Sequence, residues 1–360
     1  MAAITAAMVK ELREMTGAGM MDCKKALAET DGNMDAAVDV LKKSGAAKME
    51  KKASRIAAEG ITRVAVSGNK AVVVEVNSET DFVAKNEVFQ EFVQEVADKA
   101  LASGLNGGKD GEDVKTMMED GLEEVIADKT LKIGEKLSFR RFQTVEGDVV
   151  ATYIHGGGKI GVLVAGAGSS DDAAKEAMTN IAMQVAAMNP QYISRAEISD
   201  DELAKMKDIT LESALNDPAS LPKPILNSLI EKAVSEKAWS DEDIAIYEEK
   251  KNDMKYLFNF LSKEAAATLA NFALNDKENI ASNKIFAGLV EGRISKQLKD
   301  ICLLDQTYVK AEDGKQSVAK YLESVSKDLK IAKVVRFEVG EGMEKKSEDF
   351  AAEVAAQLNS

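Results

Sequence analysis

The sequence feature that most constrains the fold is a pattern that occurs twice, about 90 residues apart. Alternating apolar residues at 60–66 and 72–76 predict a β-hairpin. Apolar residues at helical spacing follow at 87–101. The same order of hairpin, loop and helix returns within 149–188. We therefore expect two related α+β halves.

The loops that join strand to helix in these two halves contain different residues. The first loop, Thr80 to Asn86, contains Asp81 and Phe82, whereas the second, Gly166 to Asp171, has no aromatic residue. Phe82 either packs back on the following helix as a hydrophobic staple or stands out as a plug for a crevice on another protein. Because the second half does without such a residue, the repeat favours the plug.

Three short helices are predicted within residues 1–54. A glycine-rich turn after Thr16 ends the first helix, Asp22 caps the second, and Asn33 caps a third that ends at Gly45. The first helix presents one apolar face, formed by Ile4, Met8, Leu12 and Met15. Such a bundle buries few residues in its core, so we expect it to pack against a partner or against the next domain.

Met20 and Met21 fall in that glycine-rich turn. Two interpretations remain open at this point. One methionine is buried in the bundle, or both form an exposed contact, because thioether side chains adapt readily to a partner surface.

Residues 191–300 lack the strand pattern and predict helices. Ser199 and Ser240 each precede acidic residues, which is typical of a helix start, and the prolines at 218–224 break the helices between them. The apolar segment 254–274 needs a partner helix. We therefore expect a helical hairpin or a small helical subdomain, inserted into the second half.

Four further elements complete the prediction. A helix is expected at 113–127, a strand at 137–142, and a returning strand at 334–339. Ser347 is expected to cap a short last helix that contains Phe350.

Composition excludes several classes of function. A net charge of −14 argues against a general nucleic-acid binder. Cys23 and Cys302 stand far apart, and His155 is the single histidine, so we expect neither a disulfide framework nor a multi-histidine metal site. No apolar run approaches the roughly 20 residues of a membrane span. We expect a cytoplasmic protein that does not contact membranes.

Two glycine-rich stretches resemble nucleotide-binding loops in spacing, but neither is placed as such a loop requires. Gly156, Gly158 and Gly161 have the spacing of a dinucleotide fingerprint, but they precede their strand and form a hairpin turn. The loop that starts at Gly166 is better placed, yet it ends at Asp171, where a pyrophosphate would approach. We therefore expect no cofactor and no enzymatic activity, and an enzyme that uses this loop for a cofactor remains only an alternative.

Three stretches resemble bacterial elongation factor Ts, the guanine-nucleotide exchange factor of elongation factor Tu. They are Thr16–Leu27, Thr80–Asn86 and Arg336–Gly342, and the resemblance covers about 1–195 and 283–360. It implies an α+β protein with an N-terminal three-helix module like the ubiquitin-associated fold and a core of two related α+β subdomains. It also implies an inserted coiled-coil-like helical arm and a C-terminal helical module.

Pattern and resemblance together divide the chain into six parts. About 70 residues near 212–282 exceed the usual arm, which leaves open its shape and a homodimer contact through it. The expected parts are the three-helix module at 1–54, the core N-subdomain at 55–145, the first part of the core C-subdomain at 146–194, the enlarged arm at 195–300, the return of the C-subdomain at 301–345 and the C-terminal module at 346–360.

The resemblance also assigns roles to residues. It implies that Phe82, in the turn Thr80-Asp81-Phe82-Val83, wedges between helices of the partner's G domain and disturbs the magnesium site there. The partner is elongation factor Tu, in its GDP-bound and nucleotide-free forms. Further contacts to the G domain are implied for Arg13, Met20, Met21, Lys24 and Phe350, and contacts to the partner's third domain for His155 and Gly156.

Two alternatives stay beside this interpretation. His155 could equally be an exposed turn residue that does not contact the partner. The whole chain is also consistent with a structural adaptor that binds partners through its helical arm without affecting nucleotide release.

Overall fold

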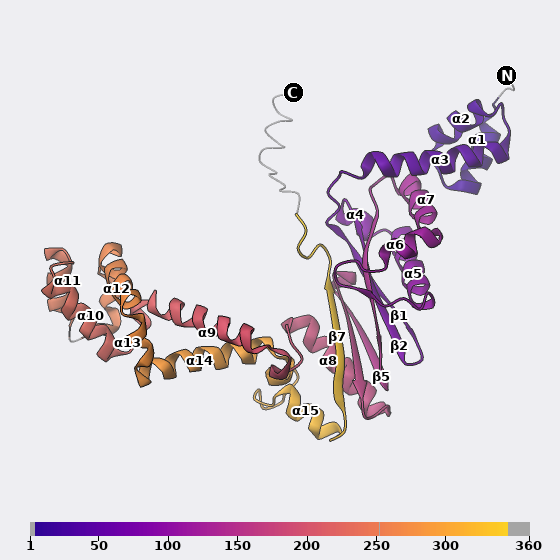
Figure 1. Ribbon diagram of the computed structural model, residues 1–360. Coiled ribbons are helices and arrows are strands. Elements are labelled where there is room, and N and C mark those ends of the chain that lie inside the picture. The colour runs from indigo at the N-terminus through magenta and orange to yellow at the C-terminus, as the bar shows by residue number, and fades with distance from the viewer. Residues whose placement is uncertain (1–3, 252, 345–360) are drawn as a thin grey trace. The chain divides into compact units, whose positions relative to one another are not determined.

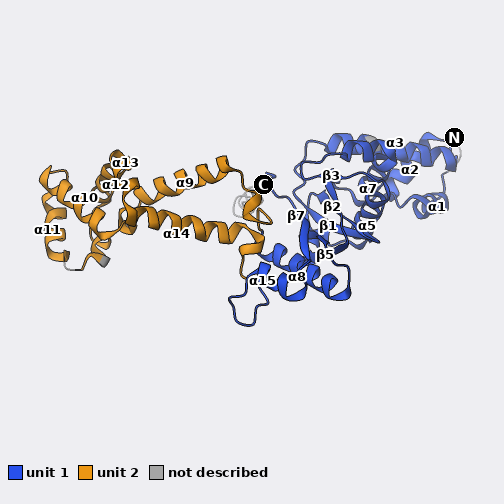
Figure 2. Ribbon diagram, turned by 60° about the horizontal axis from the view of Figure 1, so that its bottom comes forward, with its two compact units in different colours: residues 1–189, 308–360 blue, residues 190–307 orange. Residues whose placement is uncertain are grey.

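The computed structural model describes residues 4–251 and 253–344. The chain divides into two compact units, one of residues 1–189 and 308–360 and one of residues 190–307 (Figure 2). The first unit combines helices with two antiparallel sheets, and the second is helical (Figure 1). The predicted α+β class is therefore confirmed, whereas the division into six parts stays a prediction.

Three helices begin the first unit: α1 (Ala6–Thr16), α2 (Met20–Glu29) and α3 (Met34–Lys52). Asn33 caps α3 as predicted, because its side chain accepts a hydrogen bond from the Ala36 N–H at 3.0 Å. The buried core of the bundle includes Leu131 from a later helix, so the bundle packs against the next part of the chain, as expected. The bundle core consists of Val9, Leu12, Ala18, Cys23, Ala26, Leu27, Ala37, Leu41 and Leu131.

Three local predictions about this bundle are wrong. The second helix begins at Met20 with Gly19 as its N-cap, so Asp22 lies inside its first turn and does not cap it. Met15 is exposed and does not join the core face of α1. The third helix continues past Gly45 to Lys52, because α3 packs on α7 (Glu123–Ile133) so closely that a Cβ at Gly45 would lie 3.0 Å from the Ala127 carbonyl oxygen.

The first sheet has the strand order β1-β2-β4-β3. Helix α5 (Glu87–Ala102) covers one of its faces, and α7 contributes to the same core, where Phe89, Phe92 and Phe142 are fully buried (Figure 1). The hairpin β1–β2 is confirmed. The strands are β1 (Glu59–Ser67), β2 (Lys70–Ser78), β3 (Gly107–Gly108) and β4 (Ser138–Glu146).

The second sheet repeats this plan with the strand order β5-β6-β7. Its strands are β5 (Val149–His155), β6 (Ile160–Ala167) and β7 (Lys330–Glu338). Helix α8 (Asp172–Met188) packs on β5 and β6, and α15 (Val318–Val325) packs on α8. The predicted second hairpin, its helix and the returning last strand are confirmed.

The two sheets pack against each other through a shared apolar layer. Val73 of β2 lies in one cluster with Leu163 of β6 and Phe337 of β7. Strand β2 therefore has helices on one face and the second sheet on the other, and all its residues from Ala71 to Ser78 are buried. The simple alternation predicted for β2 fails because the sheet is covered on both sides.

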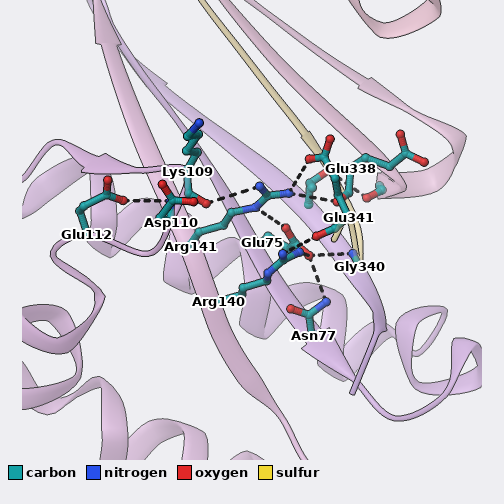
Figure 3. A network of polar contacts seen from close by, with 12 residues as sticks. Glu75, Asn77, Lys109, Asp110, Glu112, Arg140, Arg141, Glu338, Gly340 and Glu341 are labelled. Atoms are coloured by element: carbon teal, nitrogen blue, oxygen red, sulfur yellow. Dashed lines mark hydrogen bonds and ion pairs between the residues drawn. The ribbon is translucent and has the colours of Figure 1, made fainter. Parts of the chain in front are cut away.

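A buried carboxylate joins the first sheet to the end of β7 (Figure 3). Glu75 is fully buried and forms ion pairs with Arg140 at 3.0 Å and Arg141 at 2.6 Å. It also accepts a hydrogen bond from the Gly340 N–H at 2.9 Å. Because both arginines and a backbone donor satisfy the charge, this network can be buried and fixes the chain at Gly340.

The helix predicted at 113–127 is interrupted. It consists of α6 (Val114–Met117), a π-helical turn (Met118–Leu122) and α7. Gly121 breaks the helical path with φ of 89°. A left-handed conformation of this kind favours glycine.

The second unit is a small helical subdomain with its own buried core. Its helices are α9 (Asp200–Leu215), α10 (Lys223–Ser235), α11 (Asp241–Lys250), α12 (Lys263–Asn275), α13 (Lys277–Ser282) and α14 (Lys284–Ile301). Helices α9 and α14 lie side by side (Figure 2). Ser199 and Ser240 cap α9 and α11, as predicted.

The apolar segment 254–274 is not one helix. It forms a 3-10 helix (Met254–Asn259) and then α12, which starts after its N-cap Ser262. Asp243 holds this break, since it accepts hydrogen bonds from the Ser262 N–H at 2.8 Å and from its hydroxyl at 2.9 Å. Trp239 donates its indole N–H to the Ala265 carbonyl at 3.0 Å.

Candidate functional site

The turn between β2 and α5 presents Phe82 to solvent. It forms a one-turn helix, α4 (Asp81–Ala84), with Thr80 as N-cap. Phe82 is 81% exposed, whereas Ala84 is buried and Val83 packs partly against the core of the first sheet. The staple interpretation is therefore wrong, because Val83 occupies the inward position that a staple would take.

Two carboxylates hold this turn: Glu135 from a distant part of the chain, and Glu79, which directly precedes Thr80. Glu135 accepts hydrogen bonds from the Thr80 N–H at 3.0 Å and from the Thr80 hydroxyl at 2.7 Å. Glu79 accepts from the Lys136 N–H at 2.6 Å and pairs with Arg55 at 3.2 Å. The residues around 135 follow α7, so the end of that helix is bonded directly to the turn.

Sequence reasoning missed Glu135. It lies 55 residues from Thr80, and no helical or strand periodicity relates the two positions. Its one local signal is the preceding Gly134, which ends α7 with φ of 87°. That signal predicts the helix end and not the contact.

Asp81 stands at the surface beside Phe82. Its carboxylate pairs with Lys85 at 2.7 Å, and both side chains are exposed. The hydrogen bond from Lys85 lowers the pKa of the Asp81 carboxyl. The turn therefore presents an ionised carboxylate, paired with Lys85, beside an exposed aromatic ring at neutral pH.

The turn between β5 and β6 shares a cavity with the Phe82 turn. The cavity has a volume of about 740 Å³, and Thr80, Asp81, Phe82 and Gly156 are among its lining residues. Gly156 has φ of 58°, which favours glycine at this position. Two of the predicted contact regions therefore lie next to each other.

His155 lies at the end of β5 and is exposed. Its Nδ1 lies 3.1 Å from the Tyr153 hydroxyl, and the two rings are tilted toward each other. This contact is local, and its donor depends on the tautomer of His155. His155 is thus accessible to a partner, and its role stays a prediction.

The predicted contacts in the N-terminal helices form a separate surface. Met20 and Met21 occupy the first turn of α2 and are 60% and 75% exposed. The interpretation that buries one methionine is therefore wrong. Arg13 and Lys24 are also exposed, and none of these four residues lines the cavity beside Phe82. Phe350 lies outside the described residues.

Comparison with known proteins identifies the family. The family described as Elongation factor TS matches residues 79–341, more than half of the chain. An elongation factor Ts from Clostridioides difficile (strain 630) is 43% identical over 370 residues, covering 99% of this chain and 100% of that relative. The chain belongs to the elongation factor Ts family. It is a translation elongation factor, and the resemblance drawn from the three sequence stretches is confirmed.

The stretch that matches the elongation factor Ts family starts at Glu79, directly before the Thr80 turn, and includes the turn at His155. Glu135 also lies within it. The exposed methionines of α2 lie outside it. The turn, Glu135 and the neighbouring hairpin turn therefore all lie in the part of the chain that matches the family.

The described part of the chain offers neither a metal site nor a membrane-spanning helix. Residues 4–251 and 253–344 contain no group of three or more His, Cys, Asp or Glu side chains that could hold a metal ion. Among the same residues, no helix is long and apolar enough to cross a membrane.

Proposed function

We propose that this protein is the guanine-nucleotide exchange factor of elongation factor Tu. It binds elongation factor Tu·GDP and promotes release of GDP, so that GTP can then bind. Membership of the elongation factor Ts family supports the partner. The single observation that supports the mechanism is the 81% exposed Phe82 on a turn held at Thr80.

An exchange factor acts through differential binding and needs no nucleophile. It binds the nucleotide-free partner more tightly than the GDP-bound partner, and by linkage it weakens GDP binding by the same factor. A ten-thousandfold effect requires about 5.5 kcal/mol of differential binding free energy. Burial of one Phe side chain contributes about 1.5–3 kcal/mol. Phe82 therefore acts together with other contacts.

The proposed roles follow from where the side chains lie. Phe82 enters between helices of the partner's G domain and disturbs its Mg²⁺ site, with Asp81 as a charged neighbour. Thr80 and Val83 fix the turn on the core, since Thr80 bonds Glu135 and Val83 packs inward. Loss of Mg²⁺ coordination then lowers the affinity of the partner for the phosphates of GDP.

The remaining predicted residues supply the binding surface. Met20 and Met21 grip the G domain through apolar burial, with Arg13 and Lys24 at their side. Their exposure supports this role, because thioethers adapt to a partner surface. His155 and Gly156 contact the third domain of the partner from the neighbouring turn.

Release of fluorescent GDP from elongation factor Tu in a stopped-flow instrument tests this function. Increasing concentrations of the protein are expected to accelerate release up to a saturating rate. Binding without any change in the release rate would instead support a structural adaptor. Calorimetry with GDP and NAD on the protein alone tests the enzyme alternative, and heat of binding there would favour it.

A further inference from the structure

We propose that Glu135 is a positioning residue for exchange, which holds the Thr80 turn so that Phe82 points at the partner. This inference rests on the proposed exchange function. It adds a residue that does not line the cavity beside Phe82.

Glu135 contacts Thr80 at two points. Both carboxylate oxygens of Glu135 are used on this one residue, at 3.0 Å to the backbone N–H and 2.7 Å to the hydroxyl. Hydrogen bonds to a charged acceptor are stronger than those between neutral groups. A two-point contact also fixes orientation, because neither the backbone nor the hydroxyl of Thr80 can rotate without breaking one bond.

Thr80 in turn caps the short helix that contains Phe82. The Thr80 hydroxyl oxygen also accepts from the Val83 N–H at 3.4 Å, so it is the N-cap of α4. Its hydrogen points to Glu135, which leaves a lone pair for Val83. Helix α4 has four residues and is too short to be stable alone. The direction of Phe82 therefore depends on a cap that Glu135 orients.

Glu135 is itself fixed through the residues on either side of it. Lys52, at the end of α3, donates to the Gly134 carbonyl. Lys136 donates its ammonium group to the carbonyls of Ala53 at 2.6 Å and Arg55 at 2.8 Å. The residues on both sides of Glu135 are thus bonded to the chain that leaves α3. The carboxylate is held in place before a partner arrives, which is what a positioning role requires.

The same bonds suggest how the contribution of Glu135 divides between rate and affinity. The methionines of α2 and the turn at His155 remain in place when Glu135 is changed, so complex formation is largely preserved. What changes is the fraction of molecules in which Phe82 points outward in the correct direction. The saturating release rate should fall, and the concentration that gives half of that rate should stay nearly constant.

The test measures GDP release from elongation factor Tu with the full chain. We expect Glu135→Ala to lower the saturating rate about tenfold, because two hydrogen bonds to a charged acceptor are lost. The half-saturating concentration is expected to change less than about twofold. Glu124→Ala is the matched control, since Glu124 is an exposed carboxylate on α7, the helix that directly precedes Glu135, and it should behave as the unchanged protein.

A double variant separates positioning from general stability. In a Phe82→Ala background, Glu135→Ala should have no further effect on the saturating rate, because there is no ring left to aim. If the double variant instead shows the product of the two single reductions in the saturating rate, Glu135 acts on something other than Phe82, and the proposal is overturned.

A second variant covers the case in which Glu135→Ala does not fold. Glu135→Gln keeps an acceptor for the Thr80 N–H and loses the charge, so we expect a loss of about threefold. A release rate equal to that of the unchanged protein in this variant, or in Glu135→Ala, would overturn the role of Glu135 while Phe82→Ala still slows release. If Phe82→Ala itself has no effect, the exchange mechanism fails first, and the two failures are thereby distinguished.

Discussion

The two halves of the core differ in how the chain connects the second strand of the hairpin to the helix that follows it. After β2 the chain forms an extra helical turn, α4, before α5 begins at Glu87. After β6 it passes through Gly168 directly to Asp171, which caps α8. In both halves a carboxylate from elsewhere accepts from a backbone N–H of the connection, namely Glu135 at Thr80 and Asp148 at Gly168.

The difference lies in what each connection leaves at the surface. The first presents Phe82 to solvent, and the second contains only glycine, serine and aspartate between 168 and 171. The fold therefore needs a short connection with a capped helix, and it does not need an aromatic ring there. A side chain that the fold does not require is the better candidate for partner binding.

The comparison predicts its largest stability effect in the second connection. Gly168 has φ of 93°, and a Cβ there would lie 2.0 Å from the Asp328 carbonyl oxygen. Gly168→Ala should lower the free energy of unfolding by about 3 kcal/mol, from backbone strain and from the shift that this contact forces. Urea unfolding followed by circular dichroism measures this loss.

Gly104→Ala is the matched control, since Gly104 has φ of 73° and no atom within 4 Å of the Cβ position. It should cost only about 1 kcal/mol, from the left-handed conformation alone. Equal losses in both variants would contradict the steric argument. GDP release by the folded Gly168→Ala variant should remain unchanged.

The first connection should show the opposite behaviour. Phe82→Ala is expected to slow the saturating release of GDP by about 10- to 150-fold, the equivalent of about 1.5–3 kcal/mol of lost burial in the complex. The midpoint of its urea unfolding should not move, because Phe82 is exposed in the free protein.

Phe260→Ala is a suitable control for this effect, because Phe260 is 54% exposed and lies in the helical unit. It should leave GDP release unchanged. An equal loss of rate in both variants would contradict a specific wedge.

The methionines of α2 should contribute to the affinity for elongation factor Tu and not to the saturating rate of GDP release. Met20→Ala and Met21→Ala should each raise the dissociation constant of the complex about fivefold to tenfold, since each removes about 1–1.5 kcal/mol of apolar burial. The saturating release rate should stay within twofold. Titration calorimetry with elongation factor Tu and the stopped-flow assay measure the two quantities separately.

Helix caps provide a matched pair across the two halves. Asn86 accepts from the Phe89 N–H at 3.3 Å, and Asp171 accepts from the Ala174 N–H at 2.7 Å. Alanine at either position should cost about 1 kcal/mol of stability. Equal losses of stability in the two variants would show that the two caps support their helices equally. A much larger loss in one variant would contradict this equivalence.

The smallest expected effect concerns Asp81. Lys85 lowers the pKa of this carboxyl, so whatever the pair contributes is present above the ordinary aspartate pKa and is lost as pH falls through the lowered value. Lys85→Ala should raise the pKa of Asp81 toward its ordinary value, which a pH titration followed by nuclear magnetic resonance measures. GDP release at pH 7 should change less than about twofold, because Asp81 stays ionised. A larger change would mean that Lys85 itself contacts the partner.

The sequence by itself determined many of the elements of this protein. The hairpins, the helix that follows each of them, and the caps at Asn33, Ser199 and Ser240 all follow from interactions between residues a few positions apart. Such patterns are local, so they can be recognised before the fold is known. The repeat also identified Phe82 as a residue that the fold does not need.

Only the tertiary structure decided which surfaces those elements present. Helix α3 passes through Gly45 because α7 supports it, β2 is buried on both faces because a second sheet covers it, and Val83 turns inward while Phe82 remains exposed. The bond from Glu135 to Thr80 spans 55 residues. Contacts of this kind depend on how sheets and helices pack, and no local periodicity encodes them.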